Sequence, residues 1–381
     1  MSDAYEVATE KSWFSRISQS LGGLVFGPVL IIIAVVLLFW NEGRAVRTFK
    51  SLKQGEASVV NISADVVDPG YEGQLVHLTA DAFTEEILSD EDFGISVNAI
   101  RLRRDTEMYQ WKQSEKNETR QKLGGGEEKV TTYTYEKQWA SGLIDSSGFH
   151  DAAGHRNPSE IPYASMNWDA QDVSVGAFYL PENMVAQLNG FANLHVSQKT
   201  NETNWPKDAQ VEKGLIYVGF DPANPEIGDV RIRYSTVSCG PVSLVAGQAG
   251  DSFSEFQTEA GEPICIIATG RVPAQQMFQN ALAGNSLLAW LLRLFGFVLL
   301  WIGFRILFEP LQVLAGVVPI FGSLVGAAAG LISFLLAFTM ALLAIALSWV
   351  FFRPFLGITL VAVAVAVAVA ARALAKKPNS A

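Results

Sequence analysis

Residues that build catalytic and metal sites are scarce in this sequence. Cysteine occurs twice and histidine four times, and the histidines share no metal-ligand spacing. No HExxH, GxSxG or GxxxxGK[ST] segment is present, so the patterns of a zinc protease, a serine hydrolase and a P-loop nucleotide-binding protein are missing. We therefore expect no enzyme activity, no metal site and no cofactor.

The two cysteines leave two interpretations open. Cys239 and Cys265 can form a disulfide if the segment that holds them lies in an oxidising compartment. Alternatively, both are buried thiols in β-strands.

Basic residues are outnumbered by acidic ones, 28 to 38, which gives a formal net charge of −10. The acidic residues concentrate in the middle of the chain, whereas a surface that binds phosphates must be basic. We expect a solvated middle domain and no nucleic-acid partner.

Charge is wholly missing from residues 311–352, which contain no Asp, Glu, Lys, Arg or His. As one straight helix this stretch would be about 63 Å long, roughly twice the ~30 Å hydrocarbon core of a bilayer. Gly316, Pro319 and Gly322 disfavour a regular span in its first part. We therefore predict a short interfacial or re-entrant segment at 311–324 and a transmembrane helix at 325–352.

Other apolar segments predict further transmembrane helices. They lie at 21–41, 286–309 and 355–374, with tails at 1–20 and 375–381. The polar segment between the first two spans, 42–285, is then an inserted extramembrane domain. The predicted fold is a membrane protein with a helical transmembrane bundle and an inserted β-rich α+β domain, and an all-β sandwich is the alternative for that domain.

Alternating apolar and polar residues indicate that strands dominate the inserted domain. The predicted strands are 57–60, 75–78, 94–111 and 129–139, with a further group within 214–269. Two segments, 82–90 and 181–188, are predicted as helices, the second because Pro181 suits a first helical turn.

Aromatic and basic residues flank the predicted spans, where Trp and snorkelling Arg side chains usually reach the membrane boundary. The residues expected in this role are Trp40, Arg44, Arg47, Arg293, Arg305 and Arg353. For Arg293, a buried functional role is the alternative.

Gly322, Gly326 and Gly330 repeat every four residues. This small-xxx-small pattern is typical of closely packed membrane helices, within one chain or between copies. We expect the spans to support a homo-oligomer.

Five short blocks carry a resemblance to a known family. They are 40–46 (WNEGRAV), 102–111 (LRRDTEMYQW), 133–149 with its Tyr-x-Tyr-x-x-x-Trp start, 154–158 (GHRNP) and 349–354 (WVFFRP). In this order and spacing, over nearly the whole chain, they resemble the transmembrane protein 43 (LUMA) family.

The resemblance implies a multi-span membrane protein without catalytic activity, whose large domain lies outside the cell or in the lumen. Animal members organise the nuclear envelope with lamins and emerin, whereas we interpret this chain as a bacterial member. Gly154, His155, Asn157 and Pro158 have the composition of a shaped loop. His155 is either a ligand or pH switch, or a residue that hydrogen-bonds its own loop.

Basic residues give the expected sidedness. Arg372, Lys376 and Lys377 favour a cytoplasmic C-terminus, and Lys11 and Arg16 favour a cytoplasmic N-terminus. The large domain is then periplasmic, or lumenal in a eukaryote.

We interpret the function as that of a membrane-organising scaffold. Its expected partners are membrane lipid and further copies of the chain, and the sequence identifies no protein partner. The first alternative is a transporter or channel component, and a lipid-handling enzyme is less favoured.

Overall fold

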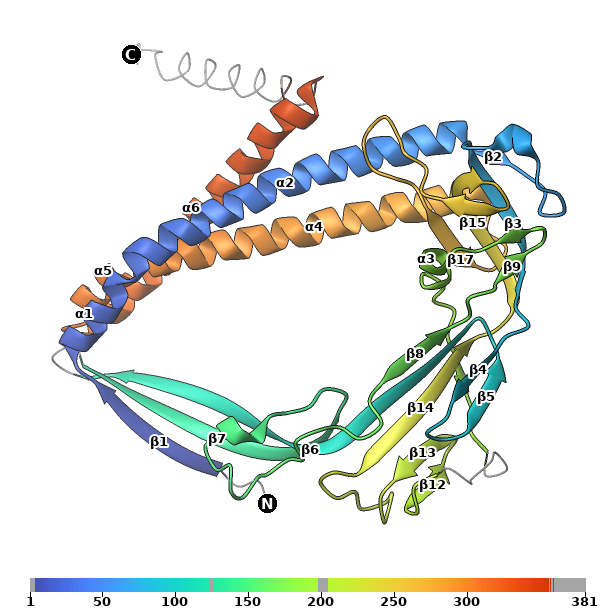
Figure 1. Ribbon diagram of the computed structural model, residues 1–381. Coiled ribbons are helices and arrows are strands. Elements are labelled where there is room, and N and C mark those ends of the chain that lie inside the picture. Colours follow the sequence, from blue (N-terminus) through green and yellow to red (C-terminus); the bar gives the residue numbers. More distant parts are fainter. Residues whose placement is uncertain (1–3, 123–125, 198–204, 356, 358, 360–381) are drawn as a thin grey trace, which may run out of the picture. The chain divides into compact units, whose positions relative to one another are not determined.

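The computed structural model describes residues 4–122, 126–197, 205–355, 357 and 359. The chain divides into two compact units. One comprises residues 1–7, 53–117 and 131–279, and the other comprises residues 8–52, 118–130 and 280–381. The first unit is rich in β-strands, and the second consists mainly of helices (Figure 1).

Three long helices dominate the helical unit. They are α2 (Gly23–Ser58), α4 (Ala274–Leu307) and α6 (Pro319–Phe352), and shorter helices are α1 (Trp13–Leu21) and α5 (Glu309–Ala315). All three long helices are apolar and long enough to cross a membrane. A membrane protein with a helical bundle is thereby confirmed. The predicted fourth span, 355–374, and the tail, 375–381, lie outside the described residues except for 355, 357 and 359.

One sheet has eight strands. Its order is β1 (Ala4–Lys11), β7 (Glu127–Ala140), β6 (Arg101–Gln121), β14 (Val230–Val237), β13 (Leu215–Val218) and β12 (Ala209–Glu212), with β8 (Met166–Asp169) on β6 and β11 (Ala192–Leu194) on β14.

A second sheet has seven strands. Its order is β10 (Phe178–Tyr179), β9 (Ser174–Val175), β3 (Leu75–Phe83), β15 (Gly240–Ala249) and β16 (Ser252–Ser254), with β17 (Ile266–Thr269) on β15 and β2 (Val60–Asn61) on β3. A short pair, β4 (Ile87–Asp90) with β5 (Ile95–Asn98), and helix α3 (Glu182–Val185) complete the β-rich domain.

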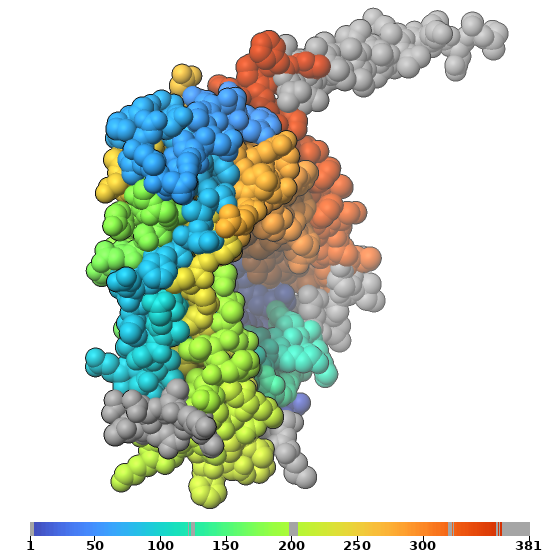
Figure 2. All heavy atoms as spheres, turned by 90° about the vertical axis from the view of Figure 1, so that its right-hand side faces the viewer, coloured from blue at the N-terminus to red at the C-terminus, as the bar shows by residue number. Residues whose placement is uncertain are grey.

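The core of the β-rich unit forms where β15 pairs with β3. Leu244 lies opposite Leu78, and Ala246 lies opposite Val76; all four side chains are buried. Because residues 242–248 of β15 are buried without alternation, both faces of this strand are covered. Figure 2 shows one surface of this unit, on which the cyan and lime segments lie next to each other.

Three local predictions differ from the structure. Residues 82–90 are not a helix: β3 ends at Phe83, and 87–90 forms β4, whose exposed and buried side chains alternate as in a half-buried strand. Of residues 57–60, predicted as a strand, 57 and 58 belong to the end of α2, and only Val60 lies in a strand, β2. The helix predicted at 181–188 is shorter and covers Glu182–Val185.

The N-terminal residues predicted as a tail contain β1 and α1. Helix α1 begins after Ser12, whose side chain accepts a hydrogen bond from the Ser15 N–H. Residues 311–324 contain most of α5 and the first turn of α6.

A buried ion pair joins three strands of the β-rich unit. Arg104 Nη1 lies 2.7 Å from a carboxylate oxygen of Asp90 and 2.7 Å from one of Asp92, and the Tyr234 hydroxyl donates to Asp90 over 2.6 Å. Burial opposes the charge on Arg104, but its bond to Asp92 and the charge of Asp90 outweigh this and raise its pKa. Burial and the bond to Asp90 raise the pKa of Tyr234 above its ordinary value.

Replacing Arg104 with methionine (R104M) should destabilise the full-length protein by about 3–5 kcal/mol, because the buried Asp90 carboxylate loses its cation. The measurement is denaturant unfolding of the detergent-solubilised protein, followed by tryptophan fluorescence. R103M on the same strand is the control, since the Arg103 side chain is 39% exposed and its loss should cost under about 1 kcal/mol. Equal destabilisation by both variants would contradict the role assigned to Arg104.

Candidate functional site

Glu42 is a fully buried acid inside the helical unit. It belongs to α2, and its side chain is 0% exposed. Arg293 of α4 donates hydrogen bonds to both carboxylate oxygens of Glu42, with Nε–Oε1 at 2.6 Å and Nη2–Oε2 at 3.0 Å. Trp349 of α6 donates its indole N–H to Oε2 over 2.7 Å. One carboxylate thus binds all three long helices; we call Glu42, Arg293 and Trp349 the polar clamp.

Neighbouring polar side chains reinforce the clamp between α2 and α4. Asn41 Nδ2 donates to the Ala289 carbonyl over 3.0 Å, and Asn285 Nδ2 donates to the Ala45 carbonyl over 2.9 Å. Arg44 Nη1 donates to Asn285 Oδ1 over 3.0 Å. Because water cannot hydrogen-bond these polar groups inside an apolar bundle, a shift of α2 along α4 would leave them unpaired at a cost in free energy. These bonds therefore fix the register of the two helices.

Glycines let the helices approach closely on both sides of the clamp. A Cβ on Gly27 would lie 2.9 Å from the Gly303 carbonyl, and one on Gly23 would lie 2.6 Å from the Ile306 carbonyl. Next to Glu42, a Cβ on Gly43 would lie 2.7 Å from the Phe352 ring. The Gly23 and Gly27 contacts are the small-xxx-small packing of α2 on α4, and Gly43 leaves room for α6.

The glycines singled out from the sequence lie elsewhere. A Cβ on Gly330 would meet Arg305 Nη1 at 2.7 Å, and one on Gly326 would meet Gln312 Oε1 at 3.7 Å. Gly322 is buried and lines a polar hollow with Gly326. Within one chain, Gly326 and Gly330 therefore face polar side chains, whereas Gly23 and Gly27 face helix backbone. Gly23 and Gly27 have the same spacing in the sequence and could have been found by it.

The arginines and the tryptophan expected at the membrane boundary divide into two groups. Arg293 and Arg44 are engaged inside the bundle, which is the alternative considered for Arg293. Arg305, Arg47 and Trp40 are exposed, and Arg353 lies over the Trp349 ring at 5.9 Å.

The shaped loop 154–158 packs against the long hairpin of β6 and β7. Asn157 accepts a hydrogen bond from the Trp111 N–H over 2.7 Å and donates to the Trp111 and Ile144 carbonyls. One side chain thus satisfies backbone groups of Trp111 in the middle of β6 and of Ile144 in the segment after β7. Pro158 follows it, as the loop composition predicts.

His155 is buried in the same loop and is enclosed by aromatic rings. Its ring stacks on Tyr135 with centroids 3.7 Å apart, and its Nδ1 lies 3.1 Å from Asp151 Oδ2. A Cβ on Gly154 would lie 2.4 Å from that same carboxylate oxygen, so glycine is needed there. The Gly154 N–H, aided by Tyr5 and His155, holds the pKa of Asp151 below its ordinary value against the effect of desolvation.

Both cysteines are free, partly buried thiols in the structure, so no Cys239–Cys265 disulfide is present there. The thiol of Cys239 donates to Asn98 Oδ1 over 3.8 Å. Burial raises the pKa of the Cys265 thiol, which keeps it protonated and unreactive.

These arrangements connect helices or strands to one another. Among the described residues, no group of three or more His, Cys, Asp or Glu side chains is placed to hold a metal ion. The buried charges of the clamp are neutralised by one another, and Asn157 and His155 are occupied by backbone and aromatic contacts. The chain thus contains two clusters of polar contacts, the polar clamp in the helical unit and the loop 154–158 in the β-rich unit.

Comparison with known proteins agrees with the shared blocks. The family model described as Transmembrane protein 43 matches residues 108–354. The chain is 31% identical to Transmembrane protein 43 of Homo sapiens over 362 residues, which covers 92% of this chain and 89% of that protein. It is 29% identical to the Transmembrane protein 43 homolog of Drosophila melanogaster over 356 residues, covering 88% and 90%. No solved structure matches the chain.

Removal of the clamp acid should destabilise the helical unit strongly. In E42A, the Arg293 guanidinium stays inside the bundle without its carboxylate, which costs about 3–5 kcal/mol. We expect a clear loss of thermal stability in detergent, measured by fluorescence-detected size exclusion after heating, and a smaller loss for E42Q. E136A is the matched control because the Glu136 side chain is 61% exposed; an E42A curve that overlays it would refute the clamp.

The lowered pKa of Asp151 predicts a pH dependence of stability. The carboxylate stabilises the fold above its unfolded pKa, about 3.9, and this contribution is lost as the pH falls through the lower pKa of the folded state. Melting temperatures measured between pH 3 and pH 7 should therefore converge for wild type and D151N at the acid end. D251N, at an exposed position, serves as the control, and a constant gap between wild type and D151N would rule the effect out.

Proposed function

Because the chain belongs to the transmembrane protein 43 family, we propose that it is a non-enzymatic membrane scaffold. The helices anchor the chain in lipid, and the β-rich domain presents a fixed surface on which other components assemble. The features described above support this assignment because each of them restrains helices or strands against one another.

One observation carries most of the argument: the hydroxyl groups of Ser333, Thr339 and Ser348 in α6 donate to carbonyls of their own helix. Ser333 donates to the Ala329 carbonyl over 2.6 Å, and Ser348 donates to the Ala344 carbonyl over 2.7 Å. Thr339 donates to the Leu335 carbonyl over 2.8 Å. A conducting pathway needs polar groups directed at a pore. The pattern supports an anchor over a transporter or channel component.

The outer face of α6 supports self-association. Leu331, Leu335 and Leu342 lie on one face of α6 and are 62%, 53% and 52% exposed, so this face contacts either acyl chains or another helix. We propose that copies of the chain associate through such faces into a homo-oligomer. Association would raise the overall affinity of the scaffold for a partner, because several copies bind it at once through individually weak contacts.

The sidedness of the termini is part of the proposal. The described residues stop before Arg372, Lys376 and Lys377, and a cytoplasmic C-terminus stays a prediction from these three charges. A cytoplasmic N-terminus likewise stays a prediction from Lys11 and Arg16.

Reconstitution separates the scaffold from a channel. Purified protein in liposomes should give ion and small-solute flux no higher than that of empty vesicles. Mass photometry in detergent or nanodiscs should give a particle larger than one 41.4 kDa chain. Flux that rises with the protein-to-lipid ratio would overturn the scaffold, and a strictly monomeric particle would remove the oligomer.

A further inference from the structure

The polar hollow beside Gly322 and Gly326 has a volume of about 450 Å³ and lies wholly within the helical unit. Its walls are the end of β1, one side of helix α1, the start of β7 and one side of helix α5. The first turns of α6, with their two glycines, form its floor. The hollow therefore opens among short segments at one end of the long helices.

Two contacts hold these walls together. The Trp13 indole N–H of α1 donates to the Val313 carbonyl of α5 over 3.1 Å. Arg16 Nε of α1 lies 2.8 Å from Glu127 Oε2 of β7, with side chains only 12% and 21% exposed. The polar hollow is therefore already formed by the chain itself.

The charges that line the hollow do not balance. Three cations, Lys11, Arg16 and Lys129, face two carboxylates, Glu127 and Glu309. The Arg16–Glu127 pair is neutral, and Lys11 Nζ donates to the uncharged Gln19 Oε1 over 3.1 Å. Within the described part of the chain, the half-buried Lys129 side chain has no ion pair. The lining thus carries one positive charge in excess.

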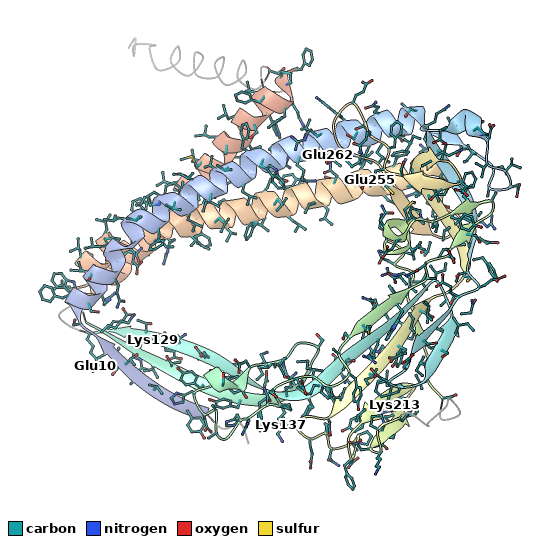
Figure 3. All side chains as sticks on the ribbon, in the orientation of Figure 1. Glu10, Lys129, Lys137, Lys213, Glu255 and Glu262 are labelled. Atoms are coloured by element: carbon teal, nitrogen blue, oxygen red, sulfur yellow. The ribbon has the colours of Figure 1, made fainter. Side chains whose placement is uncertain are left out.

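Other acids close by have a cation of their own. Lys122 binds Glu10 of β1 and Glu128 of β7, at 2.5 Å and 3.3 Å. Figure 3 shows Glu10 and Lys129 on these neighbouring strands. Because Glu10 and Glu128 share Lys122, the lysines of the hollow stay available to an anion from outside.

Helix α1 has one polar face and one apolar face. Arg16 and Gln19, three residues apart, line the hollow. Phe14 and Leu21 lie on the opposite face and are 77% and 52% exposed. A short helix of this kind is typical of the boundary between lipid and water.

Helix α5 repeats this arrangement. Glu309 and Gln312 line the hollow, whereas Leu311 and Leu314 are 55% and 52% exposed. Helix α1 directly precedes α2, which is apolar and long enough to cross a membrane. Polar groups of the hollow therefore adjoin exposed apolar side chains at the end of a span, and a ligand that satisfies both has an anionic head and an apolar tail.

We propose that the polar hollow binds the phosphodiester of an anionic glycerophospholipid, whose acyl chains cover the exposed apolar faces of α1 and α5. The single negative charge of such a lipid brings the lining to neutrality. Lysine ammonium and glutamine amide groups are suitable donors to phosphate oxygens, and basic pockets between membrane helices are known to select anionic head groups. A free phosphate dianion would overcompensate the charge and leave the apolar faces unused.

The glycine floor provides the room. The nearest atom to a Cβ on Gly326 would be Gln312 Oε1, at 3.7 Å, so the space above this residue is open. A larger side chain at this position would enter the hollow. The site needs only the helical unit, and it is independent of the scaffold role proposed above.

Lipid retention by the full-length protein tests the proposal. Native mass spectrometry of delipidated protein in detergent is performed after addition of phosphatidylglycerol, phosphatidylcholine or inorganic phosphate. We expect wild type to retain phosphatidylglycerol several-fold more than phosphatidylcholine, and K11Q/K129Q to lose this preference. K213Q is the control, because the Lys213 side chain is 88% exposed in the β-rich unit. An excess of inorganic phosphate should not displace the bound lipid.

Equal retention of the two lipids by wild type, or an unchanged preference in K11Q/K129Q, would overturn the proposal. Displacement of the lipid by inorganic phosphate would indicate a site for a soluble anion and would overturn it as well.

A second pair of variants keeps every charge in place. G326L should fill the hollow and reduce phosphatidylglycerol retention several-fold, whereas G326A, whose Cβ fits at an ordinary contact distance, should retain the lipid like wild type. Size-exclusion profiles show whether each variant is folded and monodisperse. A folded G326L that binds phosphatidylglycerol as well as G326A does would show that the lipid lies elsewhere, and the proposal would fail.

Discussion

A carboxylate without access to water dictates how the helices of this protein can pack. An isolated buried charge is costly, and a bilayer offers no solvent to relieve it. Glu42 meets this demand by binding Arg293 and Trp349, which come from two other helices. Alternative registers of α2, α4 and α6 would leave one of these groups without its partner. The clamp therefore selects one arrangement among many that apolar packing alone would tolerate.

The short sequence blocks that resemble the family lie next to one another in the structure. Glu42 of the first block binds Trp349 of the last, and Gly43 makes room for Phe352. In the β-rich unit, the Asn157 side chain hydrogen-bonds the backbone of Trp111, and His155 stacks on Tyr135. The blocks thus form two clusters, one for the helices and one for the strands. Their spacing along the chain reflects which segments must meet in the fold.

The sequence was sufficient to predict the helices and strands that depend on a local residue pattern. The uncharged run at 311–352 and the alternation around 129–139 predict a helix and a strand, because period and composition are local properties. The sequence-based predictions were incomplete where a residue far along the chain determines the local structure. Residues 87–90 form a strand because β5 pairs with them, and Arg293 turns inward because Glu42, 251 residues away, is there to bind it. Nothing in the short polar N-terminal sequence itself indicates that β1 pairs with β7, because the partner strand lies more than 100 residues further along the chain.

Arg293 illustrates how such a choice is made. A membrane arginine can extend its head to the interface or remain inside with a bidentate acid. The second option requires an acid that is itself unable to reach water, and Glu42 on the buried face of α2 satisfies that condition. Trp290 then covers the guanidinium at 4.7 Å. Both charges of the clamp and the hydroxyl groups of Ser333, Thr339 and Ser348 are engaged in contacts within the bundle, and the proposed anchor role rests on this arrangement.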